Sequence, residues 1–211
     1  MTLPGHRVIG TVLWDADGVL LRVPGGWEES MRPAVEGRVR DVEAFLSEAL
    51  TEERPALLGQ VRWLDVLPGL LARWGMAEAR DDIVAVWLSI EQVPGTHDLV
   101  RAVRATGRRC CLATNQDVDR ASHMRRTLGY DDLLDELFVS CELGVAKPDP
   151  AYFETILGRL DVDPGSVLFL DDSPRNVESA RAVGLAAETW SHEAGLPALE
   201  AVLATYGVLT G

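Results

Sequence analysis

Two aspartates one residue apart are the first residues in the chain whose types and spacing could do chemistry. Asp15 and Asp17 directly follow the apolar run from Val8 to Trp14. In an extended chain this spacing sends both side chains to the same side. One carboxylate could then attack a substrate while the other gives and takes a proton, which couples nucleophilic to general acid–base catalysis.

Three further polar groups follow later in the chain. Thr114 and Asn115 come after the apolar run at 109–113, and Asp171 and Asp172 come after the run at 167–170. Lys147 is the only lysine in the chain, whose other basic side chains are arginines. A compact ammonium can stand between a nucleophile and an anionic substrate where a guanidinium cannot, so Lys147 is a candidate for that position.

Each group has a structural interpretation when it is taken alone. Asp17 followed by glycine is typical of a turn. The pair at 114–115 could end a strand, and the pair at 171–172 could favour a helix start. The single lysine could remain by chance in a chain whose composition otherwise favours arginine. Together, in this order and each after an apolar run, the groups favour catalysis.

Strands that alternate with helices would bring these groups together. Strands are predicted over residues 8–14, 109–113, 137–140, 167–170 and 185–189. Helices are predicted over residues 99–105, 117–128, 149–160 and 173–184, with N-cap positions at Thr96, Asp117, Asp149 and Ser173. The alternation predicts an α/β fold with a Rossmann-like parallel sheet covered on both faces. Ligands bind beyond the carboxyl ends of such strands, so Asp15, Thr114 and Asp172 should converge there.

The segment from about residue 23 to residue 93 interrupts this alternation. Its patterns predict helices over 34–50, 63–74 and 82–90, with Pro68 kinking or beginning the second. Pro/Gly sequences at 24–26 and 94–95 bracket the segment. We therefore expect a small helical cap domain at 23–93, inserted into an α/β catalytic core formed by 1–22 and 94–211.

Composition excludes some classes of partner. The 211 residues carry a net charge of −13, which argues against nucleic acid and against anionic membrane surfaces. The three cysteines, Cys110, Cys111 and Cys141, have no metal-binding spacing, and reduced thiols fit a cytoplasmic protein. Residues 1–10 lack the apolar stretch of a signal peptide. Neither an oligomeric state nor a particular substrate is indicated.

With these motifs in this order, the chain resembles the haloacid dehalogenase (HAD)-like hydrolase superfamily, in its phosphatase branch with a helical cap between the first and second motifs. The four motifs are Asp15-Ala16-Asp17-Gly18-Val19-Leu20, Leu112-Ala113-Thr114-Asn115, Lys147-Pro148-Asp149-Pro150 and Leu170-Asp171-Asp172-Ser173. The resemblance covers nearly the whole chain. Each motif is weak alone, and the four together are strong.

The resemblance implies a magnesium-dependent phosphohydrolase that acts on small phosphorylated metabolites through an aspartyl-phosphate. Asp15 would be the nucleophile and Asp17 the acid and base. Magnesium would be held by the carboxylates of Asp15 and Asp172 and by the carbonyl of Asp17, because this ion prefers oxygen ligands.

The resemblance also implies a phosphate site. Thr114, Asn115 and Lys147 would bind the phosphate, and Asp171 would orient Asp172 rather than bind the metal directly.

Other activities on the same fold remain open alternatives. A 2-haloacid dehalogenase would use Asp15 on carbon without a metal, but it needs neither the acid Asp17 nor the carboxylate of Asp172. A sugar phosphomutase would pass the phosphoryl group to a second hydroxyl instead of water. A catalytically silent binding module is the alternative outside enzymes.

Overall fold

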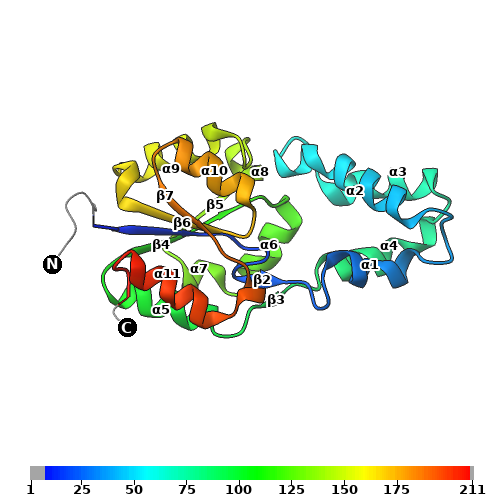
Figure 1. Cartoon of the computed structure of the whole chain (residues 1–211). Helices are drawn as coiled ribbons and strands as arrows, with labels where there is room; N and C mark the ends of the chain where they lie inside the picture. Colours follow the sequence, from blue (N-terminus) through cyan, green and yellow to red (C-terminus); the bar gives the residue numbers. More distant parts are fainter. Residues whose placement is uncertain (1–7, 210–211) are drawn as a thin grey trace.

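The computed structural model describes residues 8–209, which form a parallel sheet with helices on both faces and a helical insertion at one end (Figure 1). The strands lie in the order β5-β4-β1-β6-β7, and all their pairings are parallel. Their bounds are β1 Thr11–Trp14, β4 Arg109–Thr114, β5 Glu136–Val139, β6 Val167–Asp171 and β7 Ala186–Thr189. The predicted α/β fold is therefore confirmed. Most of the amino-terminal segment that was examined for a signal peptide, residues 1–7, lies outside the described residues.

Successive residues of the central strands enter two different hydrophobic cores. Leu13 packs with α9 (Pro150–Leu160) and α10 (Pro174–Ala182) on one face of the sheet. Val12 and Trp14 pack with α5 (Thr96–Ala105) and α11 (Leu196–Thr205) on the other face. Figure 1 shows these two helical layers above and below the sheet. Because both faces are buried, the strands are continuously apolar rather than alternating, which is why the sequence reveals them.

The predicted helix starts are partly confirmed. Asp117 caps α6 (Val118–Arg126) and Asp149 caps α9, and each carboxylate accepts hydrogen bonds from backbone N–H groups of the first turn. Thr96 was wrongly predicted as an N-cap. It is the first residue of α5, whose N-cap is Gly95, and its hydroxyl donates to the carbonyl of Val93 at 2.8 Å. The remaining short elements are α7 Tyr130–Leu133, α8 Ser140–Leu143, and the 3₁₀ turns Ala77–Ala79, Pro164–Ser166 and His192–Ala194.

Four helices make up the insertion and enclose a hydrophobic core of their own. They are α1 Trp27–Val35, α2 Val42–Leu57, α3 Trp63–Arg73 and α4 Arg80–Trp87. The single helix predicted over 34–50 is wrong. The chain turns between α1 and α2, where Gly37 has a φ of +78° and Asp41 caps α2 by accepting from the N–H of Ala44. Pro68 lies inside α3, which therefore begins before it.

A two-stranded ribbon connects the insertion to the sheet domain. β2 (Leu21–Arg22) pairs antiparallel with β3 (Glu91–Gln92), so the chain enters and leaves the insertion at the same place. Arg22 also forms an ion pair with Glu91. Two-residue strands carry no periodicity, and the sequence did not predict them.

Within residues 8–209, no helix combines the length and apolarity needed to cross a bilayer.

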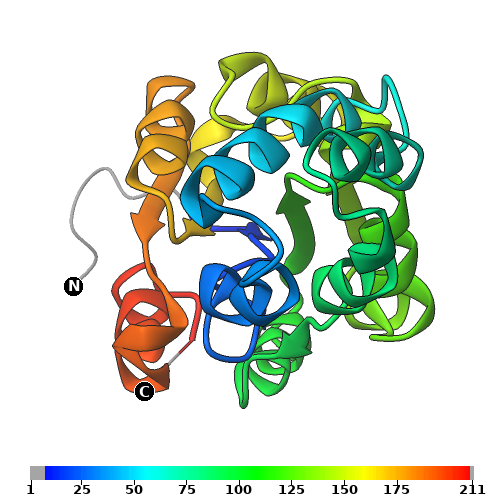
Figure 2. The same ribbon diagram turned by 90° about the vertical axis from the view of Figure 1, so that its right-hand side faces the viewer.

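The insertion touches the sheet domain directly at α6 and α8. Figure 2, which views the molecule from the side of the insertion, shows its helices in front of the sheet. Arg62, before α3, forms an ion pair with Asp119 of α6. Gly59, after α2, lies so close to the carbonyl oxygen of Cys141 that an added Cβ would fall well inside van der Waals contact. These contacts hold the insertion over the carboxyl ends of the strands.

Gly59→Ala tests this close approach, with Gly75→Ala as a matched control. Both glycines have a φ of +68°, but a Cβ on Gly75 would meet no atom within 4 Å. We expect Gly75→Ala to lose about 1 to 2 kcal/mol of unfolding free energy from backbone strain, measured by chemical denaturation, and Gly59→Ala to lose more, because its Cβ would also collide with the Cys141 carbonyl. Only Gly59→Ala should also speed hydrogen exchange around residue 141, because the loop must retreat from the Cys141 carbonyl. Equal exchange in the two variants would contradict the contact.

Candidate active site

The turn after β1 places Asp15 at the centre of the sheet edge. The N–H of Asp15 donates to the carbonyl of Leu170 at 2.9 Å, and the residue is only 6% exposed. Asp17 lies further along the turn with a half-exposed side chain. Gly18, the next residue of this turn, has a φ of +79°. A Cβ on Gly18 would collide with the carboxylate of Asp172. The glycine thus lets the turn pass close to Asp172, as no larger residue could.

Lys147 is buried in the same edge, with a side chain only 1% exposed. Its Nζ lies 2.7 Å from Oδ1 of Asp15 and 2.6 Å from Oδ2 of Asp171, and it donates to the carbonyl of Ala113 at 2.8 Å. These three acceptors satisfy its three donors. The predicted proximity of Lys147 to Asp15 is therefore present in the structure.

The buried charges shift one another's pKa values. Burial raises the pKa of the Asp15 carboxyl well above its usual range, Lys147 opposes the rise, and Asp171 adds to it. Burial alone would lower the pKa of Lys147, but Asp15 and Asp171 reverse that effect and raise it. Lys147 is therefore held as a cation.

Asp171 and Asp172, although adjacent, have different surroundings. Asp171 is completely buried, and its two oxygens accept from Lys147, from the N–H of Ser173 and from the side-chain amide of Asn176. Asp172 lines the cavity and is partly exposed. Its partial burial, and next the charge of Asp171, raise the pKa of its carboxyl. Asp171 thus has its oxygens occupied by protein groups, whereas Asp172 faces outward.

The donor set fits a divalent cation. Asp15, Asp171 and Asp172 each offer a carboxylate oxygen within 4.8 Å of the others. With Asp17, four carboxylates gather around two cations, Lys147 and Arg120. Hard oxygen ligands with excess negative charge suit magnesium, whose charge would offset both the burial and the mutual repulsion of the Asp15 and Asp172 carboxylates.

The second predicted motif lies at the end of β4. Thr114 is the last residue of the strand and is 1% exposed. The side-chain amide of Asn115 donates to the carbonyl of Lys147 at 2.8 Å and accepts from its N–H at 2.9 Å. Asn115 also lines the pocket, but these two bonds show that its side chain fixes the backbone of Lys147.

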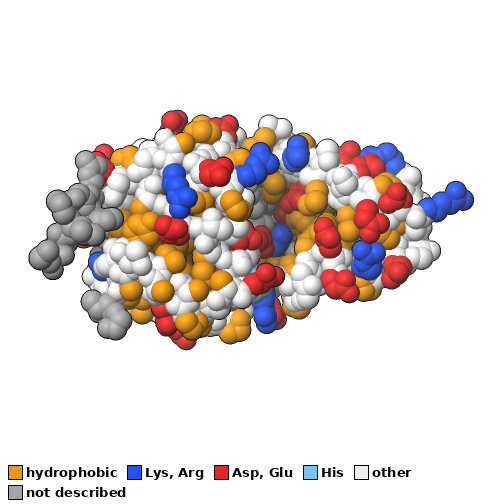
Figure 3. Space-filling model, viewed as in Figure 1, with side chains coloured by type: hydrophobic (Ala, Val, Ile, Leu, Met, Phe, Trp, Pro, Cys, Tyr) orange, Lys and Arg blue, Asp and Glu red, His pale blue; other side chains and the backbone are white. Residues whose placement is uncertain are grey.

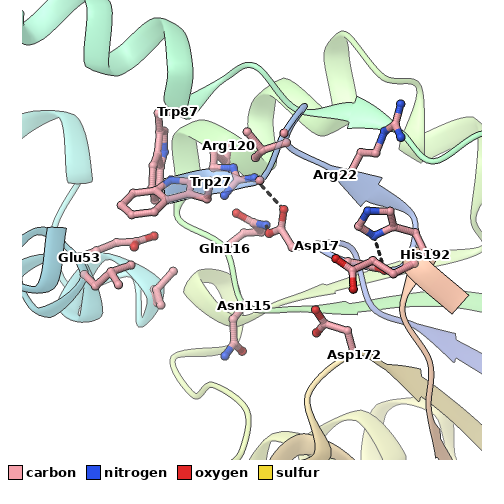
Figure 4. Close-up of a pocket in the computed structure, with 17 residues that line it drawn as sticks. Asp17, Arg22, Trp27, Glu53, Trp87, Asn115, Gln116, Arg120, Asp172 and His192 are labelled. Carbon is pink, nitrogen blue, oxygen red and sulfur yellow. Dashed lines mark hydrogen bonds and ion pairs between the residues drawn. The ribbon is translucent and has the colours of Figure 1, made fainter. Parts of the chain in front are cut away.

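Two residues that the sequence did not single out hold Asp17. Arg120 of α6 donates from Nη2 to Oδ1 of Asp17 at 2.8 Å, and Gln116 donates from Nε2 to Oδ2 (Figure 4). The guanidinium lies 5.0 Å from the ring centroid of Trp87 in α4, and the Trp87 indole N–H donates to Asp117. Asp17 is thereby connected through Arg120 to the insertion.

A cavity of about 650 Å³ opens above these residues, between the sheet edge and the insertion. Figure 3 shows the hollow between the two parts of the molecule, edged by acidic and basic side chains. Asp17, Asn115, Gln116, Arg120 and Asp172 line it from the sheet domain, and Trp27, Leu50, Glu53, Leu57 and Trp87 line it from the insertion. Trp63 is buried inside the insertion against Trp87.

Relatives by sequence include two phosphatases. A phosphorylated carbohydrates phosphatase of Thermotoga maritima is 25% identical over 82% of this chain and 81% of its own length. A sesquiterpene phosphatase of Aspergillus oryzae is 38% identical over 30% of this chain. That match spans only 33% of the Aspergillus protein.

Solved structures share the fold over nearly the whole chain. A HAD family enzyme from Bacteroides thetaiotaomicron superposes with a TM-score of 0.76 at 20% identity, covering 92% of this chain and 99% of that one. The same enzyme with magnesium and inorganic phosphate gives 0.66, again at 20% identity, covering 88% and 98%. The L-2-haloacid dehalogenase of Xanthobacter autotrophicus gives 0.63 at 21% identity, covering 92% and 83%. At these identities the likeness establishes the fold alone.

The family itself is established by a direct match. Residues 9–184 match the haloacid dehalogenase-like hydrolases, and this range contains the strands β1 to β6, the turn after β1 and all four predicted motifs. The sheet order and the helical insertion after β1 agree with that match. The chain therefore belongs to the family of haloacid dehalogenase-like hydrolases.

Proposed function

We propose that this chain is a magnesium-dependent phosphohydrolase that acts on small phosphorylated metabolites, with Asp15 as its nucleophile. The observation that carries the proposal is the buried triad of Asp15, Lys147 and Asp171 beside the exposed carboxylate of Asp172. It combines a nucleophile, a fixed cation and a set of metal ligands next to a cavity that Asp17 and Asp172 line. The phosphatases among the relatives support this choice.

In this proposal Asp15 attacks phosphorus and Asp17 manages the protons. Oδ1 of Asp15 accepts from Lys147 and from the N–H of Ala16, so the other oxygen is the one that attacks. As the O–P bond forms, the bond to the leaving alkoxide breaks, and Asp17 supplies that oxygen with a proton. Asp17 then takes a proton from the water that hydrolyses the aspartyl-phosphate.

The remaining roles follow from position. Asp15, Asp172 and the carbonyl of Asp17 would hold magnesium, which would screen the charge of the phosphoryl group and orient it. Thr114 and Lys147 bind the phosphate oxygens, and Asn115 fixes Lys147 in place. Asp171 orients both Lys147 and the segment that carries Asp172. Residues 23–93 serve as the cap over the core of 1–22 and 94–211, and the cavity size limits substrates to small molecules.

The first test of the proposal is turnover of an aryl phosphate with magnesium. We expect hydrolysis that stops when magnesium is chelated, and Asp15→Asn to lower kcat by at least about a thousandfold, since an amide is a poor nucleophile. Asp98→Asn, at an exposed position on α5, is the control and should keep full activity.

Two other outcomes would establish a different activity. Metal-independent halide release from a 2-haloacid, without phosphate release, would establish the dehalogenase. Transfer of phosphate to a sugar hydroxyl would establish the mutase.

Lys147→Arg tests whether the compact ammonium is required. A guanidinium keeps the charge but cannot occupy the point between Asp15, Asp171 and the Ala113 carbonyl. We expect kcat to fall at least about tenfold, equivalent to roughly 1.4 kcal/mol. Lys147→Met should also lose about 3 to 5 kcal/mol of unfolding free energy, because two buried carboxylates lose their partner. Arg159→Lys, at an exposed position on α9, is the matched control and should keep full activity. Full activity of Lys147→Arg would contradict the role of Lys147 between the nucleophile and the phosphate.

Arg120→Ala tests whether Arg120 positions Asp17. Because protonation of the leaving group matters more for an alkyl than for an aryl phosphate, we expect at least about a tenfold loss in kcat for the alkyl substrate and a smaller loss for the aryl one. Arg120→Lys should recover part of the difference. In an Asp17→Asn background the Arg120 substitution should have no further effect. Arg126→Ala, exposed on the same helix, is the control. Equal losses for both substrates would indicate a purely structural role.

A further inference from the structure

Glu53 differs from the other acidic residues of α2. Glu43 forms an ion pair with Arg32, and both Glu48 and Glu52 pair with Arg73 at the surface. Glu53 is only 7% exposed. Within residues 8–209, neither a hydrogen bond nor an ion pair reaches its carboxyl group. The most buried carboxyl of the helix is thus the one without a partner.

Helical spacing directs Glu53 into the cavity. Leu50, Glu53 and Leu57 recur at intervals of three and four, so they share one face of α2, and all three line the cavity. Figure 4 shows the Glu53 carboxyl group pointing from α2 toward Gln116 and Asp17 across the cavity. A purely structural wall would have an apolar residue at this position, between two leucines.

Among residues 8–209, no cation forms an ion pair with Glu53. Burial raises its pKa to about 8, the charge of Asp117 adds to the rise and Arg120 opposes it. The guanidinium of Arg120 is bonded to Asp17, and that of Arg22 to Glu91. A buried carboxyl without a partner destabilises the fold, and a ligand group that bonds to it would remove that cost.

The cavity wall around Glu53 defines what that ligand group is attached to. Trp27 and Trp87 pack edge to face on the insertion side, and with Leu50 and Leu57 they make the wall apolar. Besides Glu53, the cavity lining includes the carboxyls of Asp17, Asp172 and Glu193. An anionic group near Glu53 would meet carboxyls and two guanidinium groups that are already paired, so the wall disfavours it.

Building on the proposed phosphohydrolase activity, we infer that Glu53 binds the leaving group of the substrate through a hydrogen-bond donor. The preferred substrates are small phosphate monoesters whose leaving group has an apolar body and ends in a hydroxyl or an amine. The phosphate lies at Asp15, the body passes the Trp27 and leucine wall, and the terminal donor reaches the Glu53 carboxyl. An unsubstituted apolar end, which has no hydrogen-bond donor, and a carboxylate end are both discriminated against.

A matched panel of alkyl phosphates tests this inference. At each chain length from about three to six carbons, four esters differ only at the far end: unsubstituted, hydroxyl, amine or carboxylate. We expect kcat/KM of the wild type to be at least about tenfold higher for a donor-bearing ester than for the unsubstituted ester at one best length. The hydroxyl and amine arms identify which donor is preferred.

Two variants and a control assign the preference to Glu53. Glu53→Leu, which removes the acceptor, should abolish the preference. Glu53→Gln should keep it for the hydroxyl ester and lose it for the amine ester, because the amide accepts a hydrogen bond but cannot become the carboxylate that a bound ammonium group would stabilise. Glu52→Gln, on the neighbouring exposed residue, should behave as the wild type. Circular dichroism confirms that each variant is folded.

The inference and the proposed function fail in different ways. If the wild type shows no donor preference at any length, prefers the carboxylate ester, or keeps its preference in Glu53→Leu, then the inference is overturned. Magnesium-dependent aryl phosphate hydrolysis by the wild type would still support the phosphohydrolase in each of these cases. Loss of that hydrolysis as well would overturn both.

Discussion

The ammonium of Lys147 is the interaction on which the active site depends. It contacts groups from three adjacent strands, because Ala113 lies in β4, Asp15 follows β1 and Asp171 ends β6. One buried positive charge therefore fixes the relative positions of the carboxyl ends of these strands. It also permits two carboxylates to lie close together where water is excluded, an arrangement that mutual repulsion would otherwise oppose.

The other polar contacts extend outward from this ion cluster. Asn115 secures the backbone of Lys147, and Asn176 secures Asp171. Asp17 belongs to a second group, held by Gln116 and by Arg120 of α6. The first group depends on the sheet domain alone, whereas the second also depends on Trp87 of the insertion. Asp15 is thus positioned independently of the insertion, and Asp17 is coupled to it.

The sequence predicted those features that depend on local physics. Buried parallel strands are continuous apolar runs, so β1, β4 and β6 were recognised, and the residues that follow them converge because parallel strands end at one edge. Asp117 and Asp149 were recognised as caps because capping is a local hydrogen bond. The break between α1 and α2 was missed because the helical pattern continues across Gly37.

The roles of Arg120 and Glu53 could not be predicted, because each is set by a contact distant in sequence. Arg120 is one arginine among many until the fold brings it to Asp17, 103 residues away. Glu53 follows Glu52 directly, and their opposite environments depend on which face of α2 the sheet domain covers. A helical-spacing argument centred on Leu50 and Leu57 could have indicated Glu53, but it needed the correct bounds of α2.

The ribbon of β2 and β3 makes the insertion a removable module. Because Leu21 pairs with Gln92 and Arg22 with Glu91, the two chain crossings lie side by side, as the ends of a hairpin do. A short turn could join Arg22 to Glu91 and leave the sheet, its two helical layers and the Lys147 cluster continuous. The same geometry allows a different insertion to be grafted at this point, and the contact of Trp87 with Arg120 is the part of the present insertion that a replacement would have to reproduce.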